Sequence, residues 1–294
     1  MQPSRLYLPK LEDPPLTILD HLVQRFPQIH PDIWRERVSQ GLVTMSDGTV
    51  VREDSEYRHG IHVYYRKHVP FEPDVVEEPL IVFRDAEIIV VDKPHGMAVT
   101  PAGDHVERSL IARLQKNTGL PDLAPVHRLD RETAGLLLLT IRREARGPYH
   151  RLFSEGTIER EYLAVAHVAV ALGVKHWLIE NRIERGEPWF RQKIVSGAVN
   201  AITEIELIDA SSELGQFRLF PKTGKKHQLR VHMASIGCPI VGDPFYPTIR
   251  KKQEGEPPLQ LLAVRLTFRD PLTHTVRTFT SLRGLHTRDS IAKP

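Results

Sequence analysis

One short segment combines charged side chains with an otherwise apolar stretch of the chain. Asp130 has Arg128 and Arg131 as near neighbours, and the apolar run Leu136–Leu139 follows a few residues later. Burying an unpaired charge costs free energy, so Asp130 either forms a structural ion pair or is held ionised in order to react. The segment therefore predicts a structural ion pair or a reactive carboxylate at the mouth of a buried strand.

Four segments of the chain resemble, in the same order, the motifs of the RluA-type pseudouridine synthases. They are His127-Arg128-Leu129-Asp130 with Thr133 and Gly135, Val91 to Val99, Arg160 to Val165, and Thr223 to His232 continuing to Gly242-Asp243-Pro244. Four matches in the expected order are much more specific than one. The resemblance covers residues 80 to 280 at intervals, and it implies a function in RNA modification.

The resemblance implies three catalytic residues. Pseudouridine formation breaks the bond from ribose C1′ to uracil N1, turns the base and rejoins it through C5, so it requires a nucleophilic carboxylate. The family motif assigns this role to Asp130, whether it attacks the sugar or the base. It assigns Arg230 to keep Asp130 ionised, because a nearby guanidinium favours the charged form. Tyr162 would stack on the target uracil, and its hydroxyl would assist proton movement at C5. The scheme implies no cofactor and no metal ion.

Spacing alone supports plainer interpretations of the same residues. Arg230 would be a helix residue that is exposed to solvent or bound to phosphate, and Tyr162 would be an ordinary strand tyrosine. Leu229 would form an apolar wall of the pocket, and Lys93 would be a cation with a packing and pairing role. Only the motif match favours the catalytic interpretation of Arg230 and Tyr162.

The expected partner is structured RNA. By resemblance, Arg128 helps to displace the target nucleotide and fills the vacated space. Extruding a base costs a few kcal/mol, and least in a loop, so we expect a hairpin loop or distorted stem of rRNA or tRNA as the target. The predicted RNA-binding residues are Arg128, His127, Arg160, Lys222, Lys225, Lys226, His227 and Leu229.

Basic residues gather around the last motif. No carboxylate lies between Glu213 and Asp243, whereas Lys222, Lys225 and Lys226 precede a predicted helix. Cations oppose the dipole at a helix N-terminus, so a solvated surface explains them less well than a bound phosphate. A second basic set, from 142 to 151, is diluted by acidic residues and is interpreted as a solvated helix face.

Composition sets broad limits on the protein. The chain has 294 residues, 40% of them apolar, a formal charge of +3 and one cysteine, Cys238. The length accommodates one domain of about 200 residues and a smaller one. The single cysteine excludes an internal disulfide. No apolar leader and no run near the roughly 18 residues of a membrane span are present, so we expect a cytoplasmic protein without a membrane partner. A monomer is the expected oligomeric state.

Residues 1–68 are predicted to form a separate module. Apolar spacing predicts helices near 16–23 and 33–41, and strand patterns follow at 42–45, 49–51 and 62–65. This order resembles the alpha-L type RNA-binding module, although the usual basic first helix is missing. A generic small α+β cap is the other interpretation.

A proline-rich linker at 69–79 and a second domain at 80–294 complete the predicted organisation. A hairpin at 80–91, a helix at 109–116 and a later helix at 227–236 accompany strands near 135–141, 161–168, 201–208, 216–220, 261–268 and 275–280. The predicted fold class is α+β, with a mixed, mainly antiparallel sheet of pseudouridine synthase type. Residues 99–103 and 124–126 resemble a subgroup that modifies a tRNA anticodon stem-loop and a large-subunit rRNA hairpin.

Two other functions remain open at this point. A catalytically silent RNA-binding or ribosome-assembly factor of the same fold would be expected to lack Asp130, Tyr162 or Arg230, and all three are present. A glycosidase-like hydrolase using Asp130 and Glu132 is disfavoured because residues two apart on a strand lie about 7 Å apart without a fixed water site. Departures from the family pattern, which bear on the substrate, are Ala134, Lys225-Lys226 and Leu262.

Overall fold

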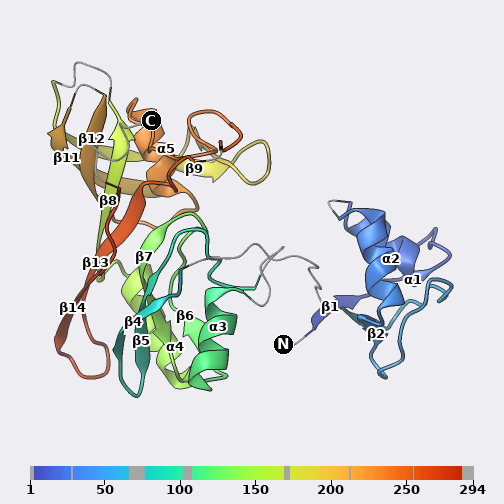
Figure 1. Ribbon diagram of the computed structural model, residues 1–294. Coiled ribbons are helices and arrows are strands. Elements are labelled where there is room, and N and C mark those ends of the chain that lie inside the picture. Colours follow the sequence, from blue (N-terminus) through green and yellow to red (C-terminus); the bar gives the residue numbers. More distant parts are fainter. Residues whose placement is uncertain are drawn as a thin grey trace. The chain divides into compact units, whose positions relative to one another are not determined.

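The structure is a computed structural model that describes residues 3–27, 29–65, 77–101, 108–168, 173–211, 213–253 and 255–286. Within these ranges the chain forms two compact units, which we call the N-terminal unit (residues 3–65) and the large unit (from residue 77) (Figure 1). Most of the predicted linker, 69–76, lies outside the described residues, as do residues 102 and 103. None of the described helices is long and apolar enough to cross a membrane.

The N-terminal unit packs two helices on a small sheet. Its elements are β1 (Ser4–Tyr7), α1 (Ile18–Arg25), α2 (Pro31–Ser39), β2 (Val43–Met45) and β3 (His62–Tyr65), with the antiparallel order β1-β3-β2. Thr17 and Asp20 form a capping box at the start of α1. Trp34 is fully buried in the core of the unit. Both helices and two of the predicted strands are confirmed, but residues 49–51 form only an isolated bridge through Val50.

The large unit consists mainly of strands that form a single extended sheet. Its elements are β4 (Leu80–Arg84), β5 (Ile88–Lys93), α3 (Leu110–Thr118), β6 (Ala124–Pro125), β7 (Ala134–Thr140), α4 (Arg143–Ser154), β8 (Glu159–His167), β9 (His176–Arg185), β10 (Gln192–Val195), β11 (Ala201–Ala210), β12 (Leu214–Pro221), α5 (Gln228–Ser235), β13 (Leu261–Arg269) and β14 (Val276–Thr280).

Counted over the described residues, this sheet has 11 strands and the unit has three helices. The strand order is β10-β9-β11-β12-β8-β13-β7-β5-β4, with β14 beside β13 and β6 beside β7. The paired strands are antiparallel except β13 with β7. The predicted mixed, mainly antiparallel sheet is therefore confirmed.

The parallel pairing of β7 with β13 joins two halves of the sheet. It spans two register pairs, Leu262 with Ala134 and Ala263 with Gly135. Gly135 has φ +109, and a Cβ there would lie 2.3 Å from the carbonyl oxygen of Ala263. Because a side chain cannot fit, glycine is required where the two strands meet. Because β13 pairs with both β7 and β8, this junction holds the loop before β7 close to β8.

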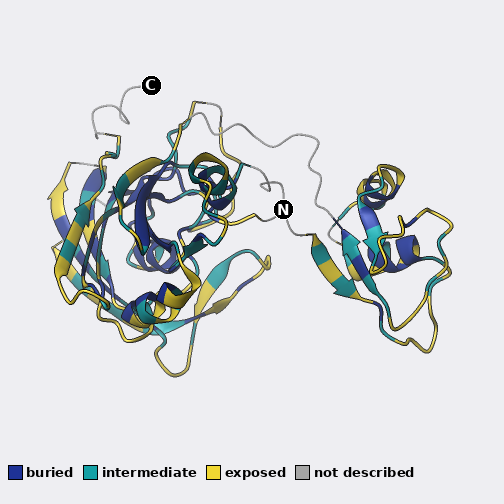
Figure 2. Cartoon of the chain, turned by 90° about the horizontal axis from the view of Figure 1, so that it is seen from below, coloured by how far each residue is buried: buried dark blue, intermediate teal, exposed yellow. Residues whose placement is uncertain are grey.

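Helices lie beside both halves of the sheet. Figure 1 shows α3 and α4 near β4 to β7, and α5 near β9 to β12. Every residue of β7 is buried, as is every residue of β5. Figure 2 shows buried residues gathered inside each unit and exposed residues on the loops and rims. The buried strands therefore form a firm base for the loop that precedes β7.

The hairpin of β9 and β10 was absent from the sequence prediction. Charged and polar residues interrupt β9, and its residues alternate between exposed and partly buried for most of its length. An edge hairpin of this kind gives no continuous apolar run, so propensity alone does not reveal it. The other predicted strands of this unit, and the helices at 109–116 and 227–236, are present with small shifts of their ends.

Candidate active site

The loop of residues 127–133 carries Asp130 and is held from below by a buried lysine. Lys93 is fully buried, and its ammonium donates to the carbonyl oxygens of Pro94 at 3.0 Å, Met97 at 2.9 Å and Arg131 at 3.1 Å. Burial lowers the pKa of Lys93 to about 7, although the charges of Glu132 and Asp130 favour the ammonium form. Lys93 thus has the structural pairing role expected of it and fixes the backbone directly after Asp130.

The opposite wall is the turn that leads into α5. The Gln228 carboxamide oxygen accepts from the Lys225 amide at 2.9 Å and from the Thr223 hydroxyl at 2.8 Å. Its amide nitrogen donates to the Ile202 carbonyl at 3.0 Å and to the Thr203 hydroxyl at 2.9 Å. One buried side chain therefore ties the turn to the sheet and fixes the backbone of the two lysines.

Arg230 has two carboxylates as neighbours. Its guanidinium donates to Asp243 Oδ2 at 2.8 Å and Oδ1 at 2.6 Å, and both side chains are 1% exposed. The distance from Arg230 Nη1 to Asp130 Oδ2 is 3.7 Å, and Asp130 is 17% exposed. Burial opposes the charge on Arg230, but the bond with Asp243 raises its pKa. Asp243 therefore holds Arg230 in place, whereas Asp130 lies farther from the Arg230 guanidinium.

His227 faces Asp130 from the same wall. Its Nε2 lies 3.7 Å from Asp130 Oδ2, and its Nδ1 lies 3.0 Å from the Tyr246 hydroxyl. Burial lowers the pKa of His227 to about 4, so the ring is neutral near pH 7. The Tyr246 oxygen accepts from the Gln192 amide at 2.7 Å, which leaves its hydrogen for Nδ1. With the Tyr246 hydroxyl donating to Nδ1, the ring proton would be on Nε2, on the side of Asp130.

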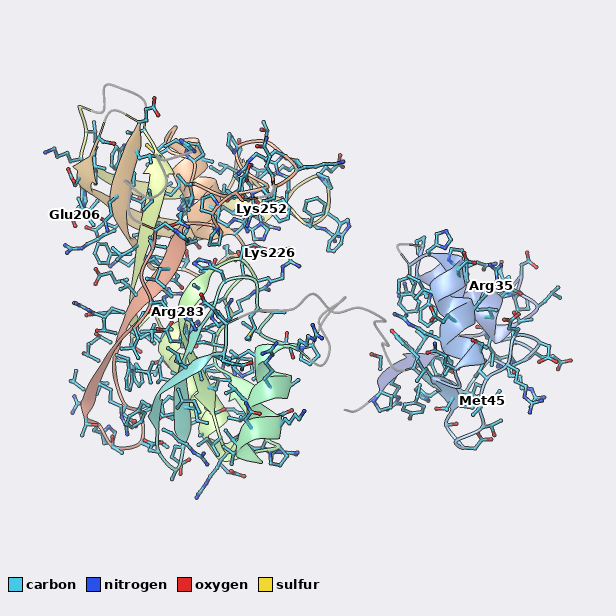
Figure 3. All side chains as sticks on the ribbon, viewed as in Figure 1. Arg35, Met45, Glu206, Lys226, Lys252 and Arg283 are labelled. Atoms are coloured by element: carbon cyan, nitrogen blue, oxygen red, sulfur yellow. The ribbon has the colours of Figure 1, made fainter. Side chains whose placement is uncertain are left out.

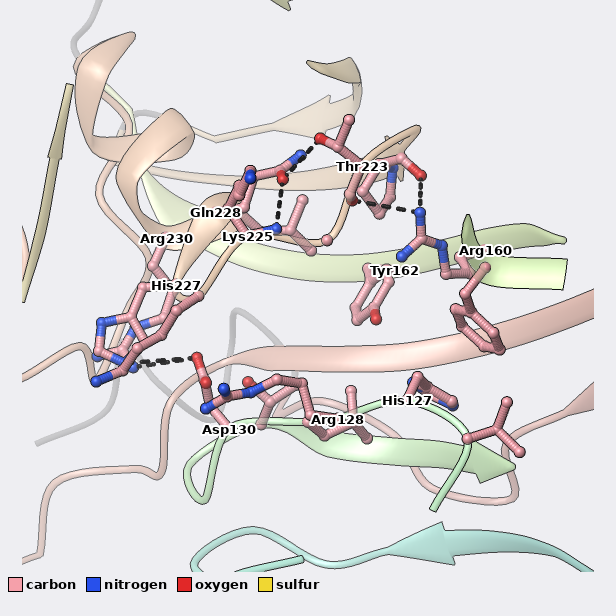
Figure 4. A pocket seen from close by; sticks show the side chains of 18 of the residues that line it. His127, Arg128, Asp130, Arg160, Tyr162, Thr223, Lys225, His227, Gln228 and Arg230 are labelled. Carbon is pink, nitrogen blue, oxygen red and sulfur yellow. Dashed lines mark hydrogen bonds and ion pairs between the residues drawn. The ribbon is translucent and has the colours of Figure 1, made fainter. Parts of the chain in front are cut away.

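Tyr162 lies between these two walls. It comes from β8, is 7% exposed, and its ring stands in the gap between the α5 turn and the Asp130 loop (Figure 4). Burial raises the pKa of Tyr162, with Arg160 opposing this shift, so the side chain is a neutral phenol near pH 7. The ring can stack against a planar group that enters the cavity.

A stack of side chains closes the end of the cavity beyond Tyr162. The His127 ring lies against Phe153 with centroids 4.6 Å apart, and the Arg160 guanidinium lies 5.7 Å from the Phe153 centroid. His127 Nε2 accepts from the Leu138 amide at 3.1 Å, and burial lowers its pKa to about 3. Arg160 donates to the Pro221 carbonyl at 2.9 Å. His127 is therefore neutral and contributes packing to the site.

The rim carries cations that face outward. Arg128 and Lys225 are exposed, and no ion pair of either is present among the described residues. Lys226 is half-buried, and Figure 3 shows it at the margin of the large unit. These side chains are available to an anionic ligand, unlike Arg230.

The cavity encloses about 520 Å³ and brings most of the predicted site residues together. The predicted site residues that line the cavity are His127, Arg128, Asp130, Arg160, Tyr162, Lys225, Lys226, His227, Leu229 and Arg230. Lys222 is exposed and does not line it.

Asp130 is the one acidic residue among the described lining residues, so a second carboxylate for glycosidase chemistry is missing. The described residues contain no group of three His, Cys, Asp or Glu side chains that could hold a metal ion.

The basic segments differ from their sequence interpretation. The stretch from 213 to 243 is not one cationic surface, because Arg230 and two neutral histidines are buried and Arg218 pairs with Glu161 at 3.3 Å. The set on α4 is not only a solvated face, because His150 and Arg151 line the cavity. Burial, which the pattern of charges does not encode, accounts for both corrections.

Sequence reasoning missed Asp243 and Tyr246, which hold Arg230 and His227. Asp243 also accepts from the backbone amide of Phe245 at 2.8 Å, so it organises the turn that carries Tyr246. A signal was present, because Gly242-Asp243-Pro244 ends the fourth matched segment and contains the first carboxylate after Glu213.

Known proteins share this sequence and fold. Residues 87–235 match the RNA pseudouridylate synthase family. The dual-specificity RNA pseudouridine synthase RluA of Vibrio parahaemolyticus is 34% identical over 212 residues, which cover 67% of this chain and 80% of that protein. The ribosomal large subunit pseudouridine synthase D of Zymomonas mobilis is 30% identical over 231 residues, or 73% and 71% of the two chains. The chain belongs to the RluA-type pseudouridine synthases.

The synthase also has the expected fold. Human RNA pseudouridylate synthase domain containing 1 aligns with a TM-score of 0.58 and 24% identity, over 72% of this chain and 86% of that one. The synthase is thus an RNA-modifying isomerase with a mixed α+β fold. Two of its departures from the family pattern, Ala134 and Leu262, are register partners across the parallel junction. These two residues are therefore neighbours in the sheet.

Proposed function

We propose that this synthase converts uridine to pseudouridine in a stem-loop of rRNA or tRNA, with Asp130 as the nucleophile. The observation that carries the proposal is the position of Asp130, which is the single acidic group among the described residues that line the cavity, beside Arg230 and Tyr162. A carboxylate that is 17% exposed is reachable by a substrate and still close to a guanidinium. Nearby positive charge favours its ionised, nucleophilic form.

Arg230 acts on Asp130 by position and charge. Asp243 accepts from Nε and Nη2 on one edge of its guanidinium, and the Phe245 and Tyr246 rings lie 5.1 and 5.4 Å from its guanidinium carbon. A guanidinium held in this way does not need to reorganise when charge changes on Asp130. A proton on His227 Nε2, which lies 3.7 Å from Asp130 Oδ2, would supply a second polar hydrogen near the carboxylate.

Tyr162 receives the base. Its ring stands opposite the Asp130 loop, where a uracil would stack upon it (Figure 4). Its phenol stays protonated near pH 7 because burial raises its pKa, so it can donate or accept a hydrogen bond while C5 loses its proton. Arg128, on the exposed rim, would occupy the space that the extruded uridine leaves.

RNA phosphates would meet the cationic rim. Arg128, Arg151, Lys225 and Lys226 all line the cavity mouth or wall, where one carboxylate faces them. The names of the two bacterial relatives, one a dual-specificity synthase and one a synthase for the large ribosomal subunit, support an rRNA or tRNA target. RNA contact by Lys222 and by the alpha-L-like N-terminal unit remains a prediction. In residues 3–65, nine acidic side chains outnumber seven basic ones, so net charge does not attract RNA to that unit.

The catalytically silent alternative is not favoured, because a structural ion pair would not require an accessible carboxylate. Tritium release from RNA labelled at uracil C5 distinguishes the two functions. We expect release by the wild-type synthase from rRNA or tRNA transcripts, and none by Asp130→Asn, which should still bind the same RNA. Release by Asp130→Asn at the wild-type rate would exclude Asp130 as the nucleophile. Binding without release by both proteins would favour the silent factor.

A further inference from the structure

The turn between β9 and β10 carries an exposed tryptophan outside the cavity. Trp189 is 62% exposed, whereas Trp34 is fully buried and Trp177 is partly buried. One exposed aromatic residue needs no special explanation by itself. Its surroundings decide whether it is part of a binding surface.

Two cations lie against the Trp189 ring. Lys226 Nζ is 5.8 Å and the Arg185 guanidinium carbon is 5.7 Å from the ring centroid. Lys226 also lines the catalytic cavity, so the tryptophan stands directly beside the cavity rim. An exposed aromatic ring with adjacent cations is the combination that single-stranded RNA requires, because bases stack on the ring and phosphates meet the charges.

The turn is fixed in place by the catalytic wall. Arg191 donates to the Pro247 carbonyl at 2.8 Å, and the Gln192 amide donates to the Tyr246 hydroxyl. Phe190 contacts Trp189 with centroids 6.0 Å apart and Phe245 at 5.0 Å. The ring is therefore held by the same turn that positions Arg230, so little ordering would be needed when a base stacks on it.

We propose that Trp189 is a stacking platform for an unpaired RNA base that flanks the uridine entering the cavity. This inference rests on the proposed function and deepens it, since it places a second, unmodified nucleotide beside the catalytic one. RNA fits the surface better than a protein partner does, because Lys226 and Arg185 continue the cationic rim of the cavity. The part of the ring that remains exposed provides the contact area.

The test measures tryptophan fluorescence and affinity with an RNA hairpin whose loop contains only uridine. A second hairpin has the same backbone but abasic loop positions. The uridine loop should quench the wild-type fluorescence, and Trp189→Phe should bind with similar affinity but without that quenching. Trp189→Ala should bind the uridine loop about tenfold more weakly, as expected for one lost stacking contact, and should bind the abasic loop as the wild type does.

Leu178→Ala is the matched control, because Leu178 is 60% exposed on the same hairpin and has no cation stacked on it among the described contacts. The platform is refuted if Trp189→Ala behaves like this control, or if the two hairpins lose affinity equally. Tritium release by the wild type is measured separately, so a working synthase with no contribution from Trp189 would refute the platform alone. Absence of release and of binding would count against both proposals.

Discussion

The buried wall of the cavity and its exposed rim both carry basic side chains, but they use them differently. On the wall, Arg230 is committed to Asp243 and His227 is a neutral ring bonded to Tyr246. On the rim, Arg128 and Lys225 extend into solvent. Residues of similar type thus divide into groups that buried partners hold in place and groups that remain open to solvent. Burial and partners, more than residue type, separate the two roles.

Removing Asp243 should produce the largest effect on the wall. Asp243→Asn leaves the Arg230 charge buried without its bidentate partner, which typically costs about 3 to 5 kcal/mol of stability. Urea unfolding measures that loss, and tritium release should fall by at least about a hundredfold because Arg230 is no longer held. Asp130→Asn should cost far less stability, because Asp130 lies farther from Arg230 and is more exposed.

Glu184→Gln is the surface control for this prediction. Glu184 pairs with Arg182 at 2.6 Å, but both side chains are more than a third exposed. Removing this pair should cost less than about 1 kcal/mol. Equal losses in Asp243→Asn and Glu184→Gln would contradict the view that Asp243 anchors the wall.

Acid should lower the stability of the folded protein through the buried histidines of α5 and its N-cap, and not through the exposed cations of the rim. Burial lowers the pKa of His227 and His232 to about 4, below the ordinary value of 6.5. Between these values the unfolded chain binds protons that the folded wall excludes, so stability is present above pH 6.5 and falls as pH drops toward 4. Urea midpoints at several pH values should reveal a loss on the order of a few kcal/mol.

His232→Gln provides the internal control for the pH effect. His232 is fully buried and is bonded to Thr203 and Asn181. The variant can be less stable at pH 7, but its stability should change less between pH 6.5 and 4. An unchanged pH slope would show that His232 does not carry this effect.

The smallest expected effect is on the rim. Lys225→Ala with Lys226→Ala should weaken RNA binding and reduce the slope of log affinity against log salt by about one to two, because up to two phosphate contacts are lost. Filter binding over a series of salt concentrations measures the slope. Lys251→Ala with Lys252→Ala removes two exposed lysines that do not line the cavity, and should leave the slope as it is. Equal slopes in the two double variants would show that Lys225 and Lys226 do not contact RNA phosphates.

The sequence identified residues better than it identified their partners. Asp130, Tyr162 and Arg230 could be identified because each lies in a motif with a specific residue pattern. The three motifs are separate in the sequence, and the three side chains line one cavity. The partnership of Arg230 with Asp243 was not predicted, since it depends on how the chain turns after α5. The neutral state of His227 was also invisible, because burial is a property of the fold.

The parallel junction has a consequence for when the enzyme becomes active. In the described strand order, β13 alone joins β7 to β8, and so joins the half that carries Asp130 to the half that carries Arg230. Its residues 261–269 follow both Asp130 and Arg230 in the sequence and are synthesised after them. During translation from the N-terminus, the nascent chain would therefore have two incomplete half-sheets until this strand emerges. Catalytic competence would arise as a late, single event in biogenesis.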